Sequence, residues 1–249
     1  MGRVDRGDML ALSRGRYDVF EAEQPKDIEA AQALRALAFG LGAPFDIDPF
    51  DPRQRHILVR ERGGGRIVCC FRIAIFHGHS INDSYAAQFY GLGRLAEFDR
   101  KLMELGRFCV HPDVADPDVV RIAWAALTRF VDAQGIRLLF GCTSFKGTDP
   151  CGFLDAFGML AQRHLAPPAW QPIEAAREVL RFADHSPSVI DRKNAAQQMP
   201  PLLRTYLLMG GWVSDHAVVD RQMNTLHVFT GLEIDAIPEN RKRLLRGLV

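Results

Sequence analysis

The most constraining stretch of the sequence is Met103–Val131, because it joins a strand pattern, a proline break and an amphipathic helix pattern. Its first part, Met103–Val110, alternates like a strand, yet it carries the charged residues Glu104 and Arg107 among apolar ones. Burying an ionised side chain is costly unless the charge is paired or lines a cleft. The two charges therefore mark the region of the chain where a functional site is expected.

A helix start follows this strand. Asp116 is suited to cap a helix, Pro117 to occupy its first position and Asp118 to stabilise its first turn. Apolar residues at helical spacing come next, and Gly135 is expected to end the helix. The nearly continuous apolar segment Ile136–Cys142 then predicts a buried strand, which completes a unit of strand, crossover helix and parallel strand.

Hydrophobic periodicity and turn residues predict the other elements. The expected helices are Asp27–Phe39, Ser84–Phe98, Asp149–Arg163, Ile173–Phe182, Pro200–Met209 and Pro238–Leu248. The expected strands are Arg16–Glu21, His56–Glu61, Arg66–Phe76, Trp212–Val219 and Thr225–Ile234. Frayed or looped chain is expected at Met1–Arg14, Ala43–Gln54 and Thr143–Thr148. This order predicts one α/β domain over residues 1–249, with a mixed sheet, helices on both faces and an insertion around residues 164–198.

The composition limits the class of protein. A hydrophobic fraction of 47% in 249 residues suits a buried core, and a net charge of +1 gives no general attraction to nucleic acid. No apolar run approaches the roughly 18 residues that a membrane span needs. Five cysteines without regular spacing, and no N-terminal apolar signal region, predict free thiols and a cytoplasmic protein.

Short and long phrases of the sequence resemble a known family. Asp46-x-Asp48-x-x-Asp51, Phe71-Arg72 and Glu104-x-x-Arg107 resemble the acidic loop, strand arginine and Glu-x-x-Arg motif of acyl-homoserine-lactone synthases, a branch of the Gcn5-related N-acyltransferase (GNAT) superfamily. The phrases QFYGLGRL, ELGRFCVHP, FGCTSFKGTD, PPLLRTYLLMGGWVSDHAVVD and NTLHVFTGLEI resemble more closely the bacterial ornithine N-α-acyltransferases. The resemblance runs from about Asp27 to Arg246. It implies a GNAT-like fold with a mostly antiparallel central sheet, a splayed strand pair and helices on both faces.

The resemblance also implies an activity and its partners. The expected reaction transfers a 3-hydroxyacyl chain from the phosphopantetheine arm of acyl carrier protein to the α-amine of L-ornithine, without a separate cofactor. The coenzyme A loop of the superfamily is Arg/Gln-x-x-Gly-x-Gly, but here the sequence is His111-Pro112-Asp113-Val114-Ala115-Asp116, whose two carboxylates would repel a pyrophosphate. Peripheral contact with the inner membrane surface is expected, since the product carries a long acyl chain, and nucleic acid is not an expected partner.

Amide formation from a thioester needs a neutral amine and a stabilised oxyanion. Glu104 is the candidate general base, and Arg107 is the second candidate catalytic residue. An ion pair of Glu104 with Arg107 or Arg72 is the structural alternative. The candidate substrate-binding residues are Asp46, Asp48, Asp51, Arg72, Phe108, Cys109 and Val110, of which the last three could donate backbone N–H groups to the oxyanion.

The arginines and the acidic loop have open alternatives. Arg72 and Arg107 could hold the carboxylate of the acceptor or the oxygens of the donor, because a guanidinium binds oxygens in pairs. They could equally pair with Asp48 and Asp51 and fasten the loop. The loop could instead bind the δ-ammonium group of ornithine.

Other residues are weaker candidates. Cys142 follows a strand but lacks the glycines of a nucleophile elbow, so a buried thiol is favoured over a cysteine hydrolase. His77, His79 and His111 have no metal-binding spacing, so no metal is expected. The basic segment Arg241–Arg243 is either a solvated face or a docking site for carrier protein or anionic lipid. Alternative functions are acylation of glutamine or lysine, acyl-homoserine-lactone synthesis, and a non-catalytic module that binds carrier protein or membrane.

Overall fold

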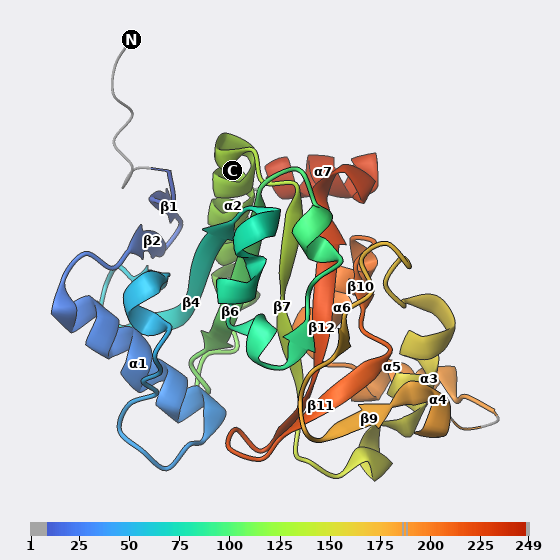
Figure 1. Ribbon diagram of the computed structural model, residues 1–249. Helices are drawn as coiled ribbons and strands as arrows, with labels where there is room; N and C mark the ends of the chain where they lie inside the picture. The colour runs from blue at the N-terminus through green and yellow to red at the C-terminus, as the bar shows by residue number, and fades with distance from the viewer. Residues whose placement is uncertain (1–8, 186, 188, 248–249) are drawn as a thin grey trace. The chain divides into compact units, whose positions relative to one another are not determined.

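The computed structural model describes residues 9–185, 187 and 189–247, which form two compact units (Figure 1). The first unit comprises the described parts of Met1–Ala74, Leu105–Ile136 and Glu239–Val249, and the second those of Ile75–Glu104 and Arg137–Pro238. The chain passes between units within strands β4 (Ile67–Phe76) and β6 (Leu102–Val110). The predicted arrangement as one domain with an insertion stays a prediction.

The strands of the first unit follow the order β1-β2-β3-β4-β6 and are antiparallel from β1 to β4. The new elements are β1 (Leu12–Arg14), β2 (Tyr17–Glu21) and β3 (Arg55–Glu61). The predicted hairpin of β3 and β4 is confirmed. The expectation of frayed chain up to Arg14 is wrong for β1, which pairs with β2, and Met1–Asp8 lie outside the described residues.

Helices cover both faces of the first unit. Helix α1 (Pro25–Phe39) packs Ala31 and Leu34 against Leu58 of β3. Helix α2 (Pro117–Gln134) lies on the opposite face, where the Arg55 guanidinium stands 4.8 Å from the ring of Phe130. Helix α7 (Glu239–Arg246) joins α2 through an ion pair between Arg246 and Asp132. The predicted end of the last helix at Leu248 lies outside the described residues.

Helix α2 begins and ends as its sequence predicts. The carboxylate of Asp116 accepts a hydrogen bond from the backbone N–H of Asp118, and Pro117 occupies the first helical position. Gly135 closes the helix in the left-handed conformation, with φ 67°.

The strands of the second unit follow the order β6-β7-β12-β11-β9. Strands β6 and β7 are parallel, pairing Leu102–Glu104 with Leu138–Phe140, as expected for a crossover through α2. The other strands are β7 (Leu138–Lys146), β12 (Thr225–Glu233), β11 (His216–Asp220), β9 (Val179–Arg181) and β10 (Trp212–Val213), which also pairs with β12. A splay of β6 and β7 beyond these pairs would involve both units and stays a prediction.

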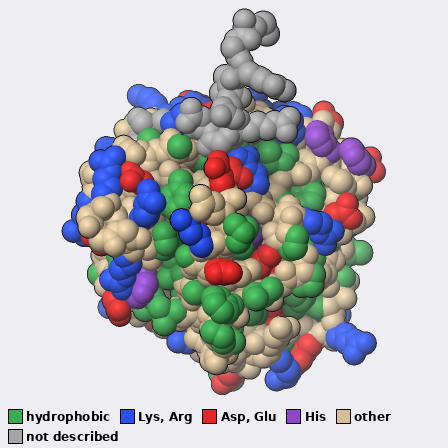
Figure 2. All heavy atoms as spheres, turned by 90° about the vertical axis from the view of Figure 1, so that its left-hand side faces the viewer, with side chains coloured by type: hydrophobic (Ala, Val, Ile, Leu, Met, Phe, Trp, Pro, Cys, Tyr) green, Lys and Arg blue, Asp and Glu red, His purple; other side chains and the backbone are tan. Residues whose placement is uncertain are grey.

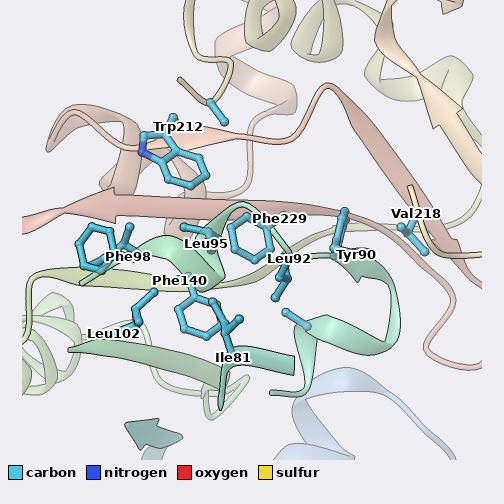
Figure 3. Close-up of a cluster of buried hydrophobic side chains, with 13 residues drawn as sticks. Ile81, Tyr90, Leu92, Leu95, Phe98, Leu102, Phe140, Trp212, Val218 and Phe229 are labelled. Carbon is cyan, nitrogen blue, oxygen red and sulfur yellow. The ribbon is translucent and has the colours of Figure 1, made fainter. Parts of the chain in front are cut away.

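Each face of the second sheet has its own hydrophobic core. On one face, α3 (Leu154–Arg163) and α6 (Pro201–Leu208) pack against Leu226 and Val228 of β12. On the other face, Phe140 and Phe229 are covered by residues 78–98, a segment of short turns that supplies side chains such as Tyr90 and Leu95 (Figure 3). The remaining helices of this unit are α4 (Phe182–His185) and α5 (Arg192–Gln198).

Two predicted helices of the second unit are wrong. Ser84–Phe98 is not a helix but 3-10 turns around strand β5 (Tyr90–Gly91), which pairs with β8 (Ile173–Glu174). A Cβ atom on Gly91 would lie 2.3 Å from a side-chain carbon of Ile173, so this approach of two backbones needs glycine. The predicted helix Ile173–Phe182 is divided between β8 and β9, because pairing with β5 and β11 replaces local hydrogen bonds.

The predicted loop Thr143–Thr148 is wrong over its first four residues. Strand β7 continues to Lys146, because all nine of its residues pair with β12. The pairing extends to Thr225, opposite Lys146, next to the turn before β12.

Candidate active site

Five of the predicted site residues lie together in the first unit, where they join an arginine that sequence analysis did not select. We define the arginine–aspartate cluster as Arg35 of α1, Arg72 of β4, Arg107 of β6 and the loop residues Asp46, Asp48 and Asp51. Three guanidinium groups thus meet three carboxylates. The charges of the cluster balance without a ligand.

Arg72 and Arg107 share the carboxylate of Asp48. Arg72 donates to both oxygens of Asp48 at 2.8 and 2.7 Å and to Asp51 at 2.6 Å. Arg107 donates to Asp46 at 2.9 Å and to Asp48 at 3.1 Å. The structure therefore contains the alternative in which Arg72 and Arg107 pair with aspartates and fasten the acidic loop. Their predicted contacts with substrate stay predictions.

Arg35 and Gln32 complete the cluster from α1. Arg35 donates to Asp51 at 2.8 and 2.9 Å and to Asp46 at 2.9 Å, and it also donates to the backbone carbonyl of Asp46. Gln32 donates to Asp51 at 3.0 Å. The sequence signal for Arg35 was its place on the helix face that holds Ala31 and Leu34, where an arginine needs a buried partner.

The arginines keep the carboxylates of Asp48 and Asp51 ionised. Burial alone raises the pKa of Asp51, but hydrogen bonds and charge from Arg35, with help from Gln32 and Arg72, lower it far below its ordinary value. The pKa of Asp48 is also lowered, because Arg72 and Arg107 outweigh its burial. These carboxylates are therefore charged at neutral pH.

Strand β6 is distorted at Arg107. Its backbone has φ 52°, in the left-handed region that non-glycine residues rarely adopt. The side chains that follow are structural: Phe108 stacks on Phe71 with ring centroids 5.5 Å apart, and the Cys109 sulfur lies 3.5 Å from that of Cys70. Half-buried Val110 ends the strand. The predicted donation of backbone N–H groups from Phe108–Val110 to an oxyanion stays a prediction.

Glu104 belongs to the second unit and is 3% exposed. One oxygen of its carboxylate accepts a hydrogen bond from the backbone N–H of Tyr85 at 3.0 Å, and the other accepts one from Ala86 at 2.8 Å. Both donors stand at the start of the 3-10 turn Ala86–Gln88. Glu104 therefore orients this turn as a distant helix cap would. No pattern within residues 84–98 could have indicated this contact.

The N-terminus of α2 already holds a carboxylate. Asp116 accepts hydrogen bonds from the Asp118 N–H at 2.9 Å, from the Tyr17 hydroxyl at 2.9 Å and from Arg16 at 2.8 Å. These contacts, the backbone one first, lower the pKa of Asp116. An anionic group at this end of the helix would therefore meet a fixed negative charge.

The weaker candidates have ordinary surroundings. His77 and His79 stack on each other at 5.8 Å, and His111 contacts Arg66. Over residues 9–185, 187 and 189–247, no three His, Cys, Asp or Glu side chains are grouped to hold a metal ion. Across the same part of the chain, no helix combines the length and the apolar character that crossing a bilayer requires.

Comparison with known proteins identifies the family. A model described as "Acetyltransferase (GNAT) domain" matches residues 16–125. The L-ornithine N(alpha)-acyltransferase of Rhodobacter capsulatus is 32% identical over 250 residues, which cover 94% of this chain and 96% of that protein. The chain belongs to the L-ornithine N(alpha)-acyltransferase family.

A second relative carries the same name. The L-ornithine N(alpha)-acyltransferase of Brucella abortus is 30% identical, with 94% of this chain and 90% of that protein covered. Among solved structures, the N-acyl amino acid synthase FeeM from uncultured soil microbes aligns with a TM-score of 0.49 at 12% identity, covering 94% of this chain and 98% of that one. As a member of the L-ornithine N(alpha)-acyltransferase family with a GNAT domain, the chain is an acyltransferase.

Proposed function

We propose that the chain transfers a 3-hydroxyacyl group from acyl carrier protein to the α-amine of L-ornithine. The acceptor is supported by relatives that carry the name L-ornithine N(alpha)-acyltransferase over nearly their whole length. In the proposed reaction the amine nitrogen attacks the thioester carbon, the carbon–sulfur bond breaks, and the pantetheine thiol and an amide are formed. Two protons leave the α-ammonium nitrogen, which keeps one hydrogen as the amide N–H: one proton passes through the general base to solvent, and the other goes to the departing sulfur.

Glu104 is the proposed general base. The observation that carries this role is a buried carboxylate on the central strand, with each oxygen held in place by a separate backbone N–H. A carboxylate offers about four acceptor positions, so two amide donors do not exhaust its capacity to take a proton from an amine. Fixed orientation is what an efficient base needs, since proton transfer requires hydrogen-bond geometry.

The arginine–aspartate cluster is the proposed binding element for the amino acid. Asp48 and Arg107 are its least buried carboxylate and guanidinium, and they are bonded to each other. Ornithine exchanges with this pair in the proposal, its carboxylate meeting Arg107 and its δ-ammonium group meeting Asp48, so that the α-amine stays available for attack. Asp46, Asp51 and Arg72 would hold the loop in place during this exchange.

The carrier protein is the proposed donor because of the charge at α2. Coenzyme A would bring a pyrophosphate toward a helix start where Asp116 is already bound and where Asp113 is also acidic. The single phosphodiester of a pantetheine arm carries less charge. The test is an enzyme assay in which product mass identifies both substrates. Three donors are compared: carrier protein loaded with a 3-hydroxyacyl chain, carrier protein loaded with an acyl chain that lacks the hydroxyl group, and acyl-coenzyme A. Each donor is offered with ornithine, lysine, glutamine and S-adenosylmethionine. Formation of no acylamide with any pair would overturn the proposal.

The role of Glu104 has its own test. Replacing Glu104 with Gln keeps the size of the side chain but removes the base, so kcat should fall by about 100-fold or more. The apparent KM should change little, whereas the melting temperature should fall by several degrees, because the amide nitrogen of Gln cannot accept from one of the two backbone N–H donors. Glu97→Gln, at an exposed position of the same unit, is the matched control. Full activity of the Glu104 variant at all pH values would refute its role as base.

A further inference from the structure

The loop of residues 43–50 has two sides of opposite chemistry. Its aspartates turn inward to the arginines of the cluster, whereas Phe45 and Ile47, which alternate with them, turn outward and are 43% and 67% exposed. We define the apolar loop face as the side chains of Phe45 and Ile47. The loop is rich in aspartate in its sequence, but in the folded protein it presents an apolar surface.

The apolar loop face is held by a rigid backbone. The Asp46 N–H donates to the Gln32 carbonyl at 3.1 Å, and the Asp46 carbonyl accepts from Arg35. The exposed side chains are thus displayed by a fixed loop. Of the eight large hydrophobic residues exposed in the described part of the chain, Phe45 and Ile47 lie two positions apart on this loop. Neighbouring apolar side chains exposed on one fixed loop indicate an interaction surface.

The charges around the loop indicate which surface it meets. Arg35, Arg72 and Arg107 neutralise the carboxylates of the loop, so these do not oppose an anionic surface. The next exposed charge along the chain is the cation Arg53, whose guanidinium lies 5.2 Å from the ring of Phe50. Apolar tips flanked by an aromatic ring and an arginine suit the headgroup region of a bilayer. Figure 2 views the side on which Figure 1 places α1, and there hydrophobic side chains gather with both basic and acidic ones among them.

We infer that the apolar loop face inserts into the interface of an anionic membrane. This inference rests on the proposed function for its purpose, because a product with one long acyl chain partitions into lipid. The arginine–aspartate cluster then has a second effect besides binding the amino acid. It withdraws three carboxylates from the surface that approaches the lipid.

Vesicle sedimentation tests the inference with the full chain. The protein is mixed with vesicles of phosphatidylcholine and phosphatidylglycerol at low and high salt, without substrates. Wild-type protein should bind, and Phe45→Ser/Ile47→Ser should bind about tenfold or more weakly. The control Val189→Ser/Leu208→Ser, at exposed apolar positions elsewhere in the chain, should bind as wild type does. Part of the binding should persist at high salt, because salt screens charges but not apolar insertion.

A second measurement keeps the test valid if the double variant folds poorly. Phe45→Trp should show blue-shifted emission with vesicles, and quenching by lipids labelled near the headgroup. No wild-type binding, equal binding by the loop variant, or an unshifted emission spectrum of the Phe45→Trp variant would each overturn the inference. The inference would also be overturned if Phe45→Ser/Ile47→Ser lost binding to acyl carrier protein, or lost self-association, while it still bound vesicles. The loop would then serve a protein partner. Since no substrate is present, these results are independent of which amino acid is acylated.

Discussion

Replacing Asp51 with Asn should destabilise the protein strongly. The carboxylate of Asp51 is 6% exposed and accepts from Arg35, Arg72 and Gln32, and the two arginines are each 1% exposed. Removing one partner of a buried ion pair costs about 3–5 kcal/mol, because the other charge stays buried. We expect about 3 kcal/mol, since Asn keeps one acceptor oxygen. For a chain of this size, that loss lowers the melting temperature by roughly 6–12 °C.

Asp235→Asn is the matched control. Asp235 also contacts two arginines, Arg100 at 2.8 Å and Arg137 at 3.1 Å, but its side chain is 55% exposed. Exposed pairs contribute about 0–1 kcal/mol, so this variant should unfold close to wild type in guanidinium and in thermal melts. If the free energies of unfolding of the two variants differ by less than about 1 kcal/mol, burial is not what makes the cluster stabilising, and the reasoning is wrong.

The lowered pKa of Asp51 predicts that the free energy of unfolding depends on pH. The pKa of Asp51 is lower in the folded protein than in the unfolded chain. Its contribution to stability is therefore complete above its unfolded pKa of about 3.9 and is lost as the pH falls toward the folded value. The free energy of unfolding of wild type should decrease below about pH 4, and Asp51→Asn should show a shallower decrease. Parallel pH curves for the two proteins would contradict this assignment.

Two further predictions concern packing and chemistry. A Cβ atom on Gly78 would lie 2.1 Å from the Ala96 carbonyl oxygen and 2.8 Å from that of Phe98, so Gly78→Ala should lower the melting temperature by several degrees, whereas Gly93→Ala, with open space at its Cβ, should not. Cys142→Ala should retain wild-type turnover and remain insensitive to iodoacetamide, because the proposed direct attack uses no cysteine nucleophile. Loss of turnover without loss of folding would instead support an acyl-enzyme.

Local sequence signals decided the elements whose hydrogen bonds are local. Helix α2 begins at Asp116 and ends at Gly135 because caps and proline act on neighbouring backbone groups. Gly40 likewise ends α1 in the left-handed conformation, although the helix begins at Pro25, two residues before the predicted Asp27. Alternating polarity located β6, and the resemblance to acyl-homoserine-lactone synthases indicated the five charged residues that meet in the arginine–aspartate cluster.

Tertiary structure decided the features that depend on residues far apart in sequence. Residues 84–98 became turns and a strand because Gly91 meets Ile173 and because Glu104 binds the N–H groups that begin a turn. The sequence showed three aspartates in one loop, but only the arginines of α1, β4 and β6 turned them inward and left Phe45 and Ile47 outside. A charge can be buried only where oppositely charged or hydrogen-bonding partners surround it, and partners from distant segments meet only in the folded protein.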